Sequence, residues 1–208
     1  MALGHIGVDE SGKGDFFGPL VVAGCYVEPK WASQLLGVTD SKKLTDKRAV
    51  ELAETIKELC PHYILVIMPR RYNELYADIK NLNRLLEWGH AKVIEEVQKL
   101  HHCELAISDQ FADPRRLVQK LKLKGVDIEL KSFVRAESDL AVAAASILAR
   151  AEFLHRMGEL SDQSGMLIPK GASAAVIAAG KRYVEMYGAD NLNQVAKLHF
   201  KTTLQVLS

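Results

Sequence analysis

The chain has 208 residues, of which 48% are hydrophobic and 25% charged, as is ordinary for a globular protein of one large domain or two small ones. Its 27 basic and 26 acidic residues leave a net charge of +1, so binding to a polyanion would require positive charge gathered on one face. Three scattered cysteines argue against a disulfide framework and a cysteine-based zinc site, and they suit a reducing cytoplasm. No apolar run is long enough to cross a membrane and no signal peptide is recognisable, so we expect a cytoplasmic protein without a membrane partner.

The first element in chain order is a strand that begins by about His5 and delivers two neighbouring acids, Asp9 and Glu10. A loop containing three glycines follows, and a second apolar strand covers residues 20–27. We expect these strands to form an antiparallel hairpin, with no module ahead of it.

Helices and strands alternate after the hairpin. Apolar spacing predicts helices at 45–60, 82–100 and 114–123, and strands at 63–68, 104–109 and 126–134. A long helix at 139–160 is apolar nearly all round in its first half and should pack deep in the domain, and two further helices are expected at 172–187 and 192–207. This order predicts an α/β fold with a mixed five-stranded sheet flanked by helices on both faces. No linker divides the chain, so we expect one domain over residues 1–208, with a C-terminal helical extension at about 161–208.

Acidic residues stand where predicted buried strands end or the long helix begins: Asp9 and Glu10, Asp109, and Glu137 with Asp139. Ligands gather at the carboxyl ends of strands in open α/β sheets, so we expect these acids to converge. Two unit charges about 4 Å apart repel by about 4 kcal/mol at an effective dielectric constant near 20, so such a cluster must bind protons or a cation. Oxygen ligands without a His or Cys cluster favour Mg²⁺ or Mn²⁺, and two such ions serve in-line attack on a phosphodiester.

Each acid also has a purely structural interpretation. Asp109 could cap the following segment, and Glu137 could interact with the dipole of the long helix. Asp9 and Glu10 would point to opposite faces of a regular strand. Both can face one site only if the strand ends or bulges between them, as the Ser-Gly that follows would allow.

The glycine-spaced loop allows two interpretations. Gly12, Lys13 and Gly14 could form a simple turn, or a backbone that approaches a ligand closely, with a lysine beside the acids. The spacing is not that of a P-loop. Residues 40–43, with the sequence DSKK, are typical of a solvated loop before a helix on pattern alone.

The segment 7–19, GVDESGKGDFFGP, resembles the signature of type 2 ribonucleases H, the family of ribonucleases HII and HIII. The segments 40–44 (DSKKL) and 143–150 (AAASILAR) are similar to two further blocks of that family, in the same order. Features similar to ribonuclease HIII are Lys13 between its glycines and the segments 109–112, 167–173 and 196–201. Many ribonucleases HIII also carry an N-terminal substrate-binding domain, which we do not expect here.

The resemblance implies a ribonuclease H-like fold and endonucleolytic cleavage of the RNA strand in RNA–DNA hybrids, leaving 5′-phosphate and 3′-hydroxyl ends. It implies two Mg²⁺ or Mn²⁺ ions, held by the catalytic acids Asp9, Glu10, Asp109 and Glu137, with Asp139 open as an alternative to Glu137. Two alternative functions stay open: incision at single ribonucleotides embedded in DNA, as in ribonuclease HII, and non-catalytic binding of hybrids. We expect a monomer.

The substrate would contact the loop beside the acids. The backbone of residues 12–14 is the candidate reader of the 2′-hydroxyl group, because glycine lets main-chain groups approach the sugar. Lysines would hold phosphates and supply the local positive charge that the small net charge conceals. The candidate substrate-binding residues are Gly12, Lys13, Gly14, Ser41, Lys42, Lys43, Lys170 and Ser173.

Overall fold

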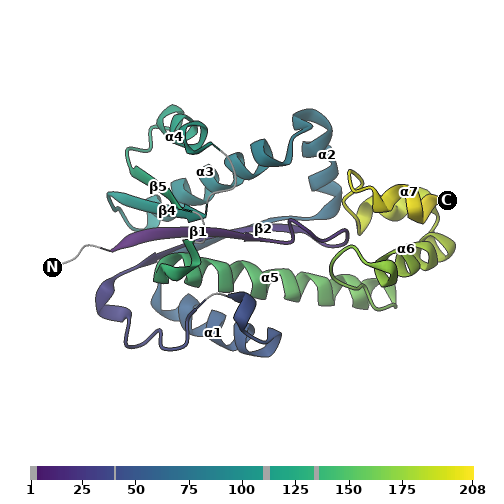
Figure 1. Cartoon of the computed structure of the whole chain (residues 1–208), viewed down its shortest axis with the longest axis horizontal. Coiled ribbons are helices and arrows are strands. Elements are labelled where there is room, and N and C mark those ends of the chain that lie inside the picture. The colour runs from purple at the N-terminus through teal and green to yellow at the C-terminus, as the bar shows by residue number, and fades with distance from the viewer. Residues whose placement is uncertain (1–3, 40, 110–112, 134–135) are drawn as a thin grey trace.

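A five-stranded mixed sheet runs through the centre of the molecule (Figure 1). The computed structural model describes residues 4–39, 41–109, 113–133 and 136–208, apart from the side chains of Lys42 and Glu137. The spatial order of the strands is β3-β2-β1-β4-β5; β1 to β3 are antiparallel neighbours, whereas β4 and β5 run parallel to β1. The expected mixed sheet is therefore confirmed. Its strands are β1 (His5–Ser11), β2 (Leu20–Val27), β3 (His62–Ile67), β4 (Leu105–Asp109) and β5 (Glu129–Phe133).

Helices cover both faces of this sheet (Figure 1). One face carries α1 (Asp46–Leu59) and α5 (Leu140–Ser164), and the other carries α2 (Pro69–Ile79), α3 (Leu82–Leu100) and α4 (Pro114–Leu123). Alternation along β2 explains this division, because Val21 and Ala23 pack into a core with α1 and α5, while Val22 packs with α3. Every residue of α5 from Ala141 to Ala149 is buried, as its apolar sequence predicts.

Most predicted elements agree with the structure to within a few residues at each end. The helix predicted at 82–100 has the observed bounds of α3. α1 follows Thr45, whose hydroxyl accepts a hydrogen bond from the Arg48 amide at 3.2 Å and so caps the helix. The strand predicted at 126–134 is longer than β5, because the amide of Val126 still bonds to the Leu121 carbonyl at the end of α4.

The helix α2 has no counterpart among the predicted elements. It begins directly after β3 with Pro69 in its first turn, where a missing amide hydrogen costs nothing. Tyr72, Leu75, Tyr76 and Ile79 follow at helical spacing and pack against the side of the sheet that α3 covers.

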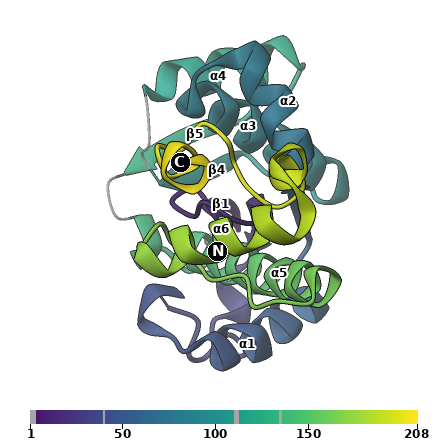
Figure 2. The same cartoon turned by 90° about the vertical axis from the view of Figure 1, so that its right-hand side faces the viewer.

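The C-terminal part of the chain lies beyond one end of the sheet (Figures 1 and 2). It contains α6 (Ala174–Tyr187), the 3₁₀ helix η4 (Ala189–Gln194) and α7 (Thr202–Leu207), so the continuous helix predicted at 192–207 is wrong. Residues between these helices pair instead with the segment after β1. The Gly18 amide donates to Val195 O at 2.9 Å and the Lys197 amide to Phe16 O at 2.8 Å, and this long-range pairing overrides the local helix preference.

Three short 3₁₀ helices complete the secondary structure of the described residues: η1 (Pro29–Trp31), η2 (Ser41–Lys43) and η3 (Ala136–Ser138). Among the described helices, none is both long and apolar enough to cross a membrane.

Strand β1 touches the backbone of α5 directly at Gly7. A Cβ atom on Gly7 would lie 2.0 Å from the carbonyl carbon of Ala141 and 2.1 Å from the nitrogen of Val142. Protein interiors contain no such short contacts, so the missing side chain sets how near the strand lies to the helix.

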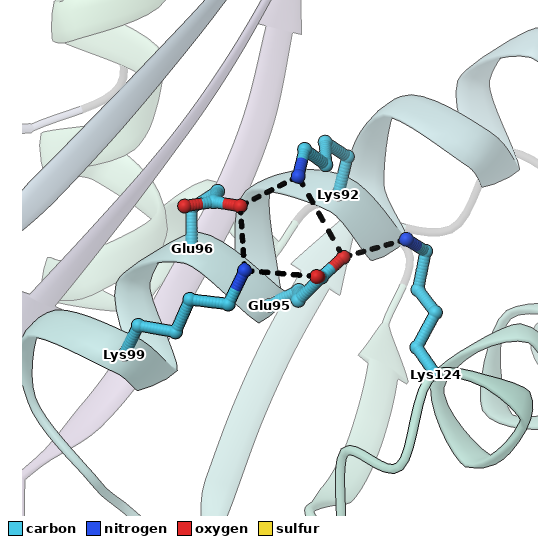
Figure 3. A network of polar contacts seen from close by, with 5 residues as sticks. All are labelled: Lys92, Glu95, Glu96, Lys99 and Lys124. Carbon is cyan, nitrogen blue, oxygen red and sulfur yellow. Dashed lines mark hydrogen bonds and ion pairs between the residues drawn. The ribbon is translucent and has the colours of Figure 1, made fainter.

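A network of charged side chains joins α3 to the end of α4 (Figure 3). Lys124, just after α4, is 2.5 Å from Glu95, and Lys99 is 3.0 Å from Glu95 and 2.9 Å from Glu96. Lys92 is 2.5 Å from Glu96. Hydrogen bonds from Lys124 and Lys99 lower the pKa of Glu95 to about 2.

Replacing Gly7 by alanine should destabilise the fold by roughly 3 kcal/mol, because the new methyl group must push β1 away from the backbone of α5. Urea unfolding followed by circular dichroism measures the effect. Gly158→Ala is the matched control, since Gly158 lies in α5 with no atom within 4 Å of the position of a Cβ. That change should stabilise the protein by about 0.5–1 kcal/mol through helix propensity. Equal stabilities of the two variants would contradict the explanation by close approach.

The Glu95 network should make stability depend on pH. The folded pKa of Glu95, about 2, lies below its ordinary value of 4.5, so its stabilising contribution is present above pH 4.5 and is lost as the pH falls towards 2. Glu95→Gln should lower the free energy of unfolding at pH 7 by roughly 1 kcal/mol, allowing for solvent screening, and by less at pH 3. Urea titrations of both proteins at the two pH values provide the measurement. Glu129→Gln, which breaks an exposed 3.4 Å pair with Lys131, is the control with little expected effect.

Candidate active site

The carboxyl ends of β1 and β4 lie next to each other in the middle of the sheet. These strands are parallel, and Val8 is paired with Ser108. The next residues, Asp9 and Asp109, therefore stand side by side on strands about 4.8 Å apart. The structure brings together the acids that the sequence places at these two strand ends.

Asp9 and Glu10 belong to opposite faces of the sheet, yet both line one cleft. β1 continues without interruption to Ser11, with Asp9 opposite Ala23 and Glu10 opposite Val22 on β2. The expectation that the strand ends or bulges between the two acids is therefore wrong. The pairing of β1 with β4 extends only to Val8, and the cleft opens beyond that point, where side chains from both faces can reach it.

The carboxyl group of Asp9 lies on the α5 side. Burial, followed by the charges of Glu10 and Asp109, raises the pKa of Asp9 to about 7, although a hydrogen bond with the Ser146 side chain acts in the opposite direction. The Ser146 hydroxyl in turn shares a 2.7 Å hydrogen bond with Ser41. Burial thus disfavours the ionised form of Asp9 more than any neighbouring charge does, and a cation placed beside it would favour that form.

Glu10 has more polar partners than Asp9. Its Oε2 atom is 3.1 Å from Nε2 of His90, and its Oε1 atom accepts a hydrogen bond from Nζ of Lys13 at 3.3 Å. Burial raises the pKa of Glu10, but His90 and then Lys13 outweigh this effect and leave the pKa below its ordinary value. Glu10 is thus the acid of the pair that is more readily ionised.

Position 137 adjoins this cluster through its backbone. The Ala136 amide donates to Asp109 Oδ1 at 3.3 Å, and Glu137 is the next residue of the same 3₁₀ helix, η3. The side chain of Glu137 is outside the described part of the structure.

Asp139 is engaged elsewhere. Its carboxylate caps α5 by accepting hydrogen bonds from the amides of Ala141 and Val142 at 3.0 and 3.1 Å, and it contacts His5 at 2.9 Å. His5 precedes Asp9 by four positions, or about 13 Å along a strand. Asp139 also does not line the cleft, and its contacts are those of a helix cap.

The loop after β1 is held by a segment far away in the sequence. Asp15 Oδ1 accepts a hydrogen bond from the Gly171 amide at 2.6 Å, and the Phe16 amide donates to Gly171 O at 2.9 Å. These bonds join the loop that contains the candidates Gly12, Lys13 and Gly14 to the segment that contains two further candidates, Lys170 and Ser173.

Lys197 holds the far end of the same loop. Its side chain is fully buried, and Nζ donates to the carbonyl oxygens of Gly18, Phe17 and Pro19 at 2.7, 3.2 and 3.4 Å. Burial lowers the pKa of this lysine to about 7. Because buried carbonyl groups need a hydrogen-bond donor, the C-terminal segment is part of the structure that supports the cleft.

The cleft has a volume of about 590 Å³. The candidates from the sequence that line it are Asp9, Glu10, Gly12, Lys13, Gly14, Ser41, Asp109 and Lys170. Lys43 and Ser173 are exposed and lie outside its lining, with Ser173 at the N-cap of α6. The side chain of Lys42 is outside the described part of the structure.

Positive side chains line the same cleft as the acids. Arg150 of α5 and Lys170 lie 2.7 and 2.6 Å from the two carboxylate oxygens of Asp46, and Arg150 also donates to the carbonyl oxygen of Ser41. Hydrogen bonds from Lys170 and Arg150 lower the pKa of Asp46. The cleft therefore combines a carboxylate cluster with cations, as a site for phosphate groups and metal ions requires.

The donor set fits a hard divalent cation. Asp9, Glu10 and Asp109 offer only oxygen atoms to the cleft, and His90 contacts Glu10 without lining it. Among the described residues, no three His, Cys, Asp or Glu side chains are already gathered in a coordination geometry. Burial and then the charges of Glu10 and Asp109 raise the pKa of Asp9, and a bound cation would offset both effects.

Sequence reasoning gave no role to three residues of this site: His90, Ser146 and Arg150. Ser146 had a detectable signal, because it is a polar residue in an otherwise apolar buried stretch of α5, whereas His90 shares its buried face of α3 with the charged residue Glu87. Arg150 stands at the end of the apolar half of α5, where an arginine is unremarkable.

Known proteins resemble the chain over nearly its whole length. The family model for ribonuclease HII matches residues 6–203. The chain is 49% identical over 205 residues to a ribonuclease HIII of Protochlamydia amoebophila, which covers 98% of this chain and 68% of that protein. It is 45% identical over 207 residues to a ribonuclease HIII of Chlamydia abortus, covering 97% of this chain and 69% of that protein. The crystal structure of Bst-RNase HIII in complex with Mn²⁺ has a TM-score of 0.91 and 35% identity, covering 99% of this chain and 69% of that one.

The two glycines that flank Lys13 should respond differently to substitution. Gly12 has a φ of +84°, and a Cβ atom there would lie 2.1 Å from Pro19 O, so Gly12→Ala should cost roughly 1–3 kcal/mol of stability. Gly14 has no atom within 4 Å of the position of a Cβ, so Gly14→Ala should change stability by less than about 0.5 kcal/mol. Urea unfolding of the two variants is the measurement. A large loss in Gly14→Ala would show that the loop has a different conformation.

Proposed function

The chain belongs to the ribonuclease HII family, and from that premise we propose that it is an endoribonuclease of the HIII type, which hydrolyses the RNA strand of RNA–DNA hybrids. The observation that carries this proposal is the meeting of Asp9, Glu10 and Asp109 in one cleft with Lys13 and Lys170. The ribonuclease HIII relatives named above, and the Mn²⁺ complex of Bst-RNase HIII, support it.

Asp9, Glu10, Asp109 and Glu137 would together hold two Mg²⁺ or Mn²⁺ ions. When bound, such ions supply an activated water and stabilise charge on the attacked phosphate and the leaving 3′-oxygen, which gives 5′-phosphate and 3′-hydroxyl ends. The protein contributes fixed positions for the acids: two on β1, one at the end of β4 and one in η3. Ser146 holds Asp9 and His90 holds Glu10, so neither carboxylate is free to turn away from the cleft.

The loop at residues 12–14 is the proposed contact for the sugar of the RNA strand. Space around Gly14 lets its backbone approach a 2′-hydroxyl group, which a DNA strand lacks. Gly12 serves the turn itself, because its positive φ and its contact with Pro19 O exclude a side chain.

Phosphate groups would be held by cations along the cleft and beside it. Lys13, Arg150 and Lys170 line the cleft, each beside a carboxylate, and would supply the positive charge that phosphate groups require there. Ser41 lines it as well, next to Ser146. Lys43 and Ser173, which are exposed outside the lining, would contact the duplex where it extends past the cleft. Lys42 is the remaining proposed contact.

We also propose that the enzyme works in a reducing cytoplasm. Cys25, Cys60 and Cys103 are all buried and unpaired, so the fold depends on no disulfide bond.

The proposed function is tested with four end-labelled substrates: an RNA–DNA hybrid, a DNA duplex, an RNA duplex, and a DNA duplex with one embedded ribonucleotide. The purified protein with Mg²⁺ or Mn²⁺ should cleave the hybrid at several internal sites, leave the DNA and RNA duplexes intact, and lose activity in EDTA. Preference for the single ribonucleotide would contradict the assignment to the HIII type. Absence of cleavage in every substrate would contradict the enzymatic assignment altogether.

Asp109→Asn and Glu137→Gln should each lower the rate of hybrid cleavage on the order of 100- to 1000-fold, because each removes a charge that holds the metal ions. Thermal unfolding should show that both variants remain folded.

Asp139→Asn is the matched control for these variants. Asparagine still caps a helix, so this change should preserve cleavage while removing the ionic part of the contact with His5. Loss of cleavage in Asp139→Asn with full activity in Glu137→Gln would reverse the choice of the fourth acid.

A further inference from the structure

The side chain of His90 joins two of the proposed metal-binding acids from the α3 side of the sheet. It is completely buried, with Nε2 3.1 Å from Glu10 Oε2 and Nδ1 3.0 Å from the hydroxyl oxygen of Ser108. The Ser108 hydroxyl oxygen also lies 3.0 Å from the backbone carbonyl oxygen of Asp109. One imidazole ring therefore contacts Glu10 directly and reaches Asp109 through the residue before it.

The acceptor chemistry fixes the direction of the contact with Glu10. An ionised carboxylate only accepts hydrogen bonds, so Nε2 of His90 carries a hydrogen and donates it to Glu10. The other nitrogen is held by Ser108, which is itself fully buried. Rotation of the ring would break both contacts, so packing and hydrogen bonds give it a single orientation.

Glu10 has a second partner in Lys13, at 3.3 Å from Oε1, but the two contacts differ in rigidity. The Lys13 side chain is 39% exposed, whereas that of His90 is 0% exposed. An exposed lysine can leave its partner at little cost, so the buried histidine determines where the Glu10 carboxylate lies.

We infer that His90 is a positioning residue, which holds the Glu10 carboxylate in the orientation that a divalent cation requires. The inference rests on the proposed function, because it takes Glu10 as a metal ligand. Fixing the carboxylate during folding removes the cost of ordering it when the cation binds. Loss of such a contact behind a metal ligand typically weakens metal binding about 10- to 100-fold.

Two amide substitutions separate the contacts of the ring. In His90→Gln the amide extends as far as Nε2 of the histidine and can still donate to Glu10. In His90→Asn it extends only as far as Nδ1, so it can bond to Ser108 but not to Glu10. The two variants have the same polarity and differ in the single contact on which the inference depends.

The readout is Mn²⁺ binding to the substrate-free protein, measured by isothermal titration calorimetry and by the electron paramagnetic resonance signal of free Mn²⁺. His90→Asn should bind Mn²⁺ about 10- to 100-fold more weakly than wild type, and His90→Gln should stay within about threefold. Wild-type affinity in His90→Asn, or an equal loss in both variants, would overturn the inference.

His62→Asn is the matched control, because His62 lies on β3 and its Nδ1 atom contacts the Cys60 carbonyl at 2.8 Å. Its Mn²⁺ affinity should equal that of wild type. Thermal unfolding in EDTA reports on the fold: a purely structural role for His90 would lower the melting temperature without changing the Mn²⁺ affinity of the folded protein. If His90→Asn does not fold, Ser108→Ala replaces it as the test. Ser108→Ala should bind Mn²⁺ roughly threefold or more weakly than wild type, and unchanged binding would count against the inference.

Failure of the inference is distinguishable from failure of the proposed function. If the wild-type protein neither binds Mn²⁺ nor cleaves a hybrid, the proposed function is wrong. If it does both while His90→Asn binds Mn²⁺ like wild type, only the role of His90 is wrong.

Discussion

The missing side chain at Gly7 sets the geometry on which the cleft depends. Because a methyl group there would lie 2.0 Å from a backbone carbon of α5, strand and helix meet main chain to main chain. That contact fixes the position of β1 relative to α5, both before and after Gly7 in the strand. His5 reaches Asp139 at the start of α5, and Asp9, on the same face of the strand as Gly7, comes within hydrogen-bonding reach of Ser146. The position of the first acid thus follows from the packing of a glycine two residues earlier.

The sheet separates two acids that are neighbours in sequence. Asp9 faces the α5 side and Glu10 the α3 side, and each meets a different helix: Ser146 from one and His90 from the other. The consequence is electrostatic, because the pKa of Asp9 is raised to about 7 while that of Glu10 is lowered. Partners inside the protein already stabilise the ionised form of one acid. The buried carboxyl group of Asp9 has no such cationic partner among the described residues, so the two neighbouring acids differ in how readily they ionise.

The sequence was sufficient for features that depend on local pattern or on a family signature. The bounds of α3 and the convergence of Asp9 with Asp109 are examples, since helical periodicity and strand ends are visible in the sequence. The helix at 192–207 was wrong because residues 195–197 pair with a loop far away in the chain, which no local pattern shows. The contact of His90 with Glu10 could not be predicted either, because it requires the packing of α3 across β1 and β4.

The hydrogen bonds from Lys197 to the loop after β1 cannot form until long after the loop has been synthesised. The carbonyl oxygens of Phe17 and Pro19 accept hydrogen bonds from Lys197, which lies 180 and 178 positions further along the chain. A ribosome adds about 5–20 residues per second, so roughly 10 to 40 s pass between the synthesis of the loop and that of its partner. During that interval the loop that follows the two acids of β1 lacks the hydrogen bonds of Lys197. The contacts between Lys197 and this loop can therefore form only after all five strands of the sheet have been made.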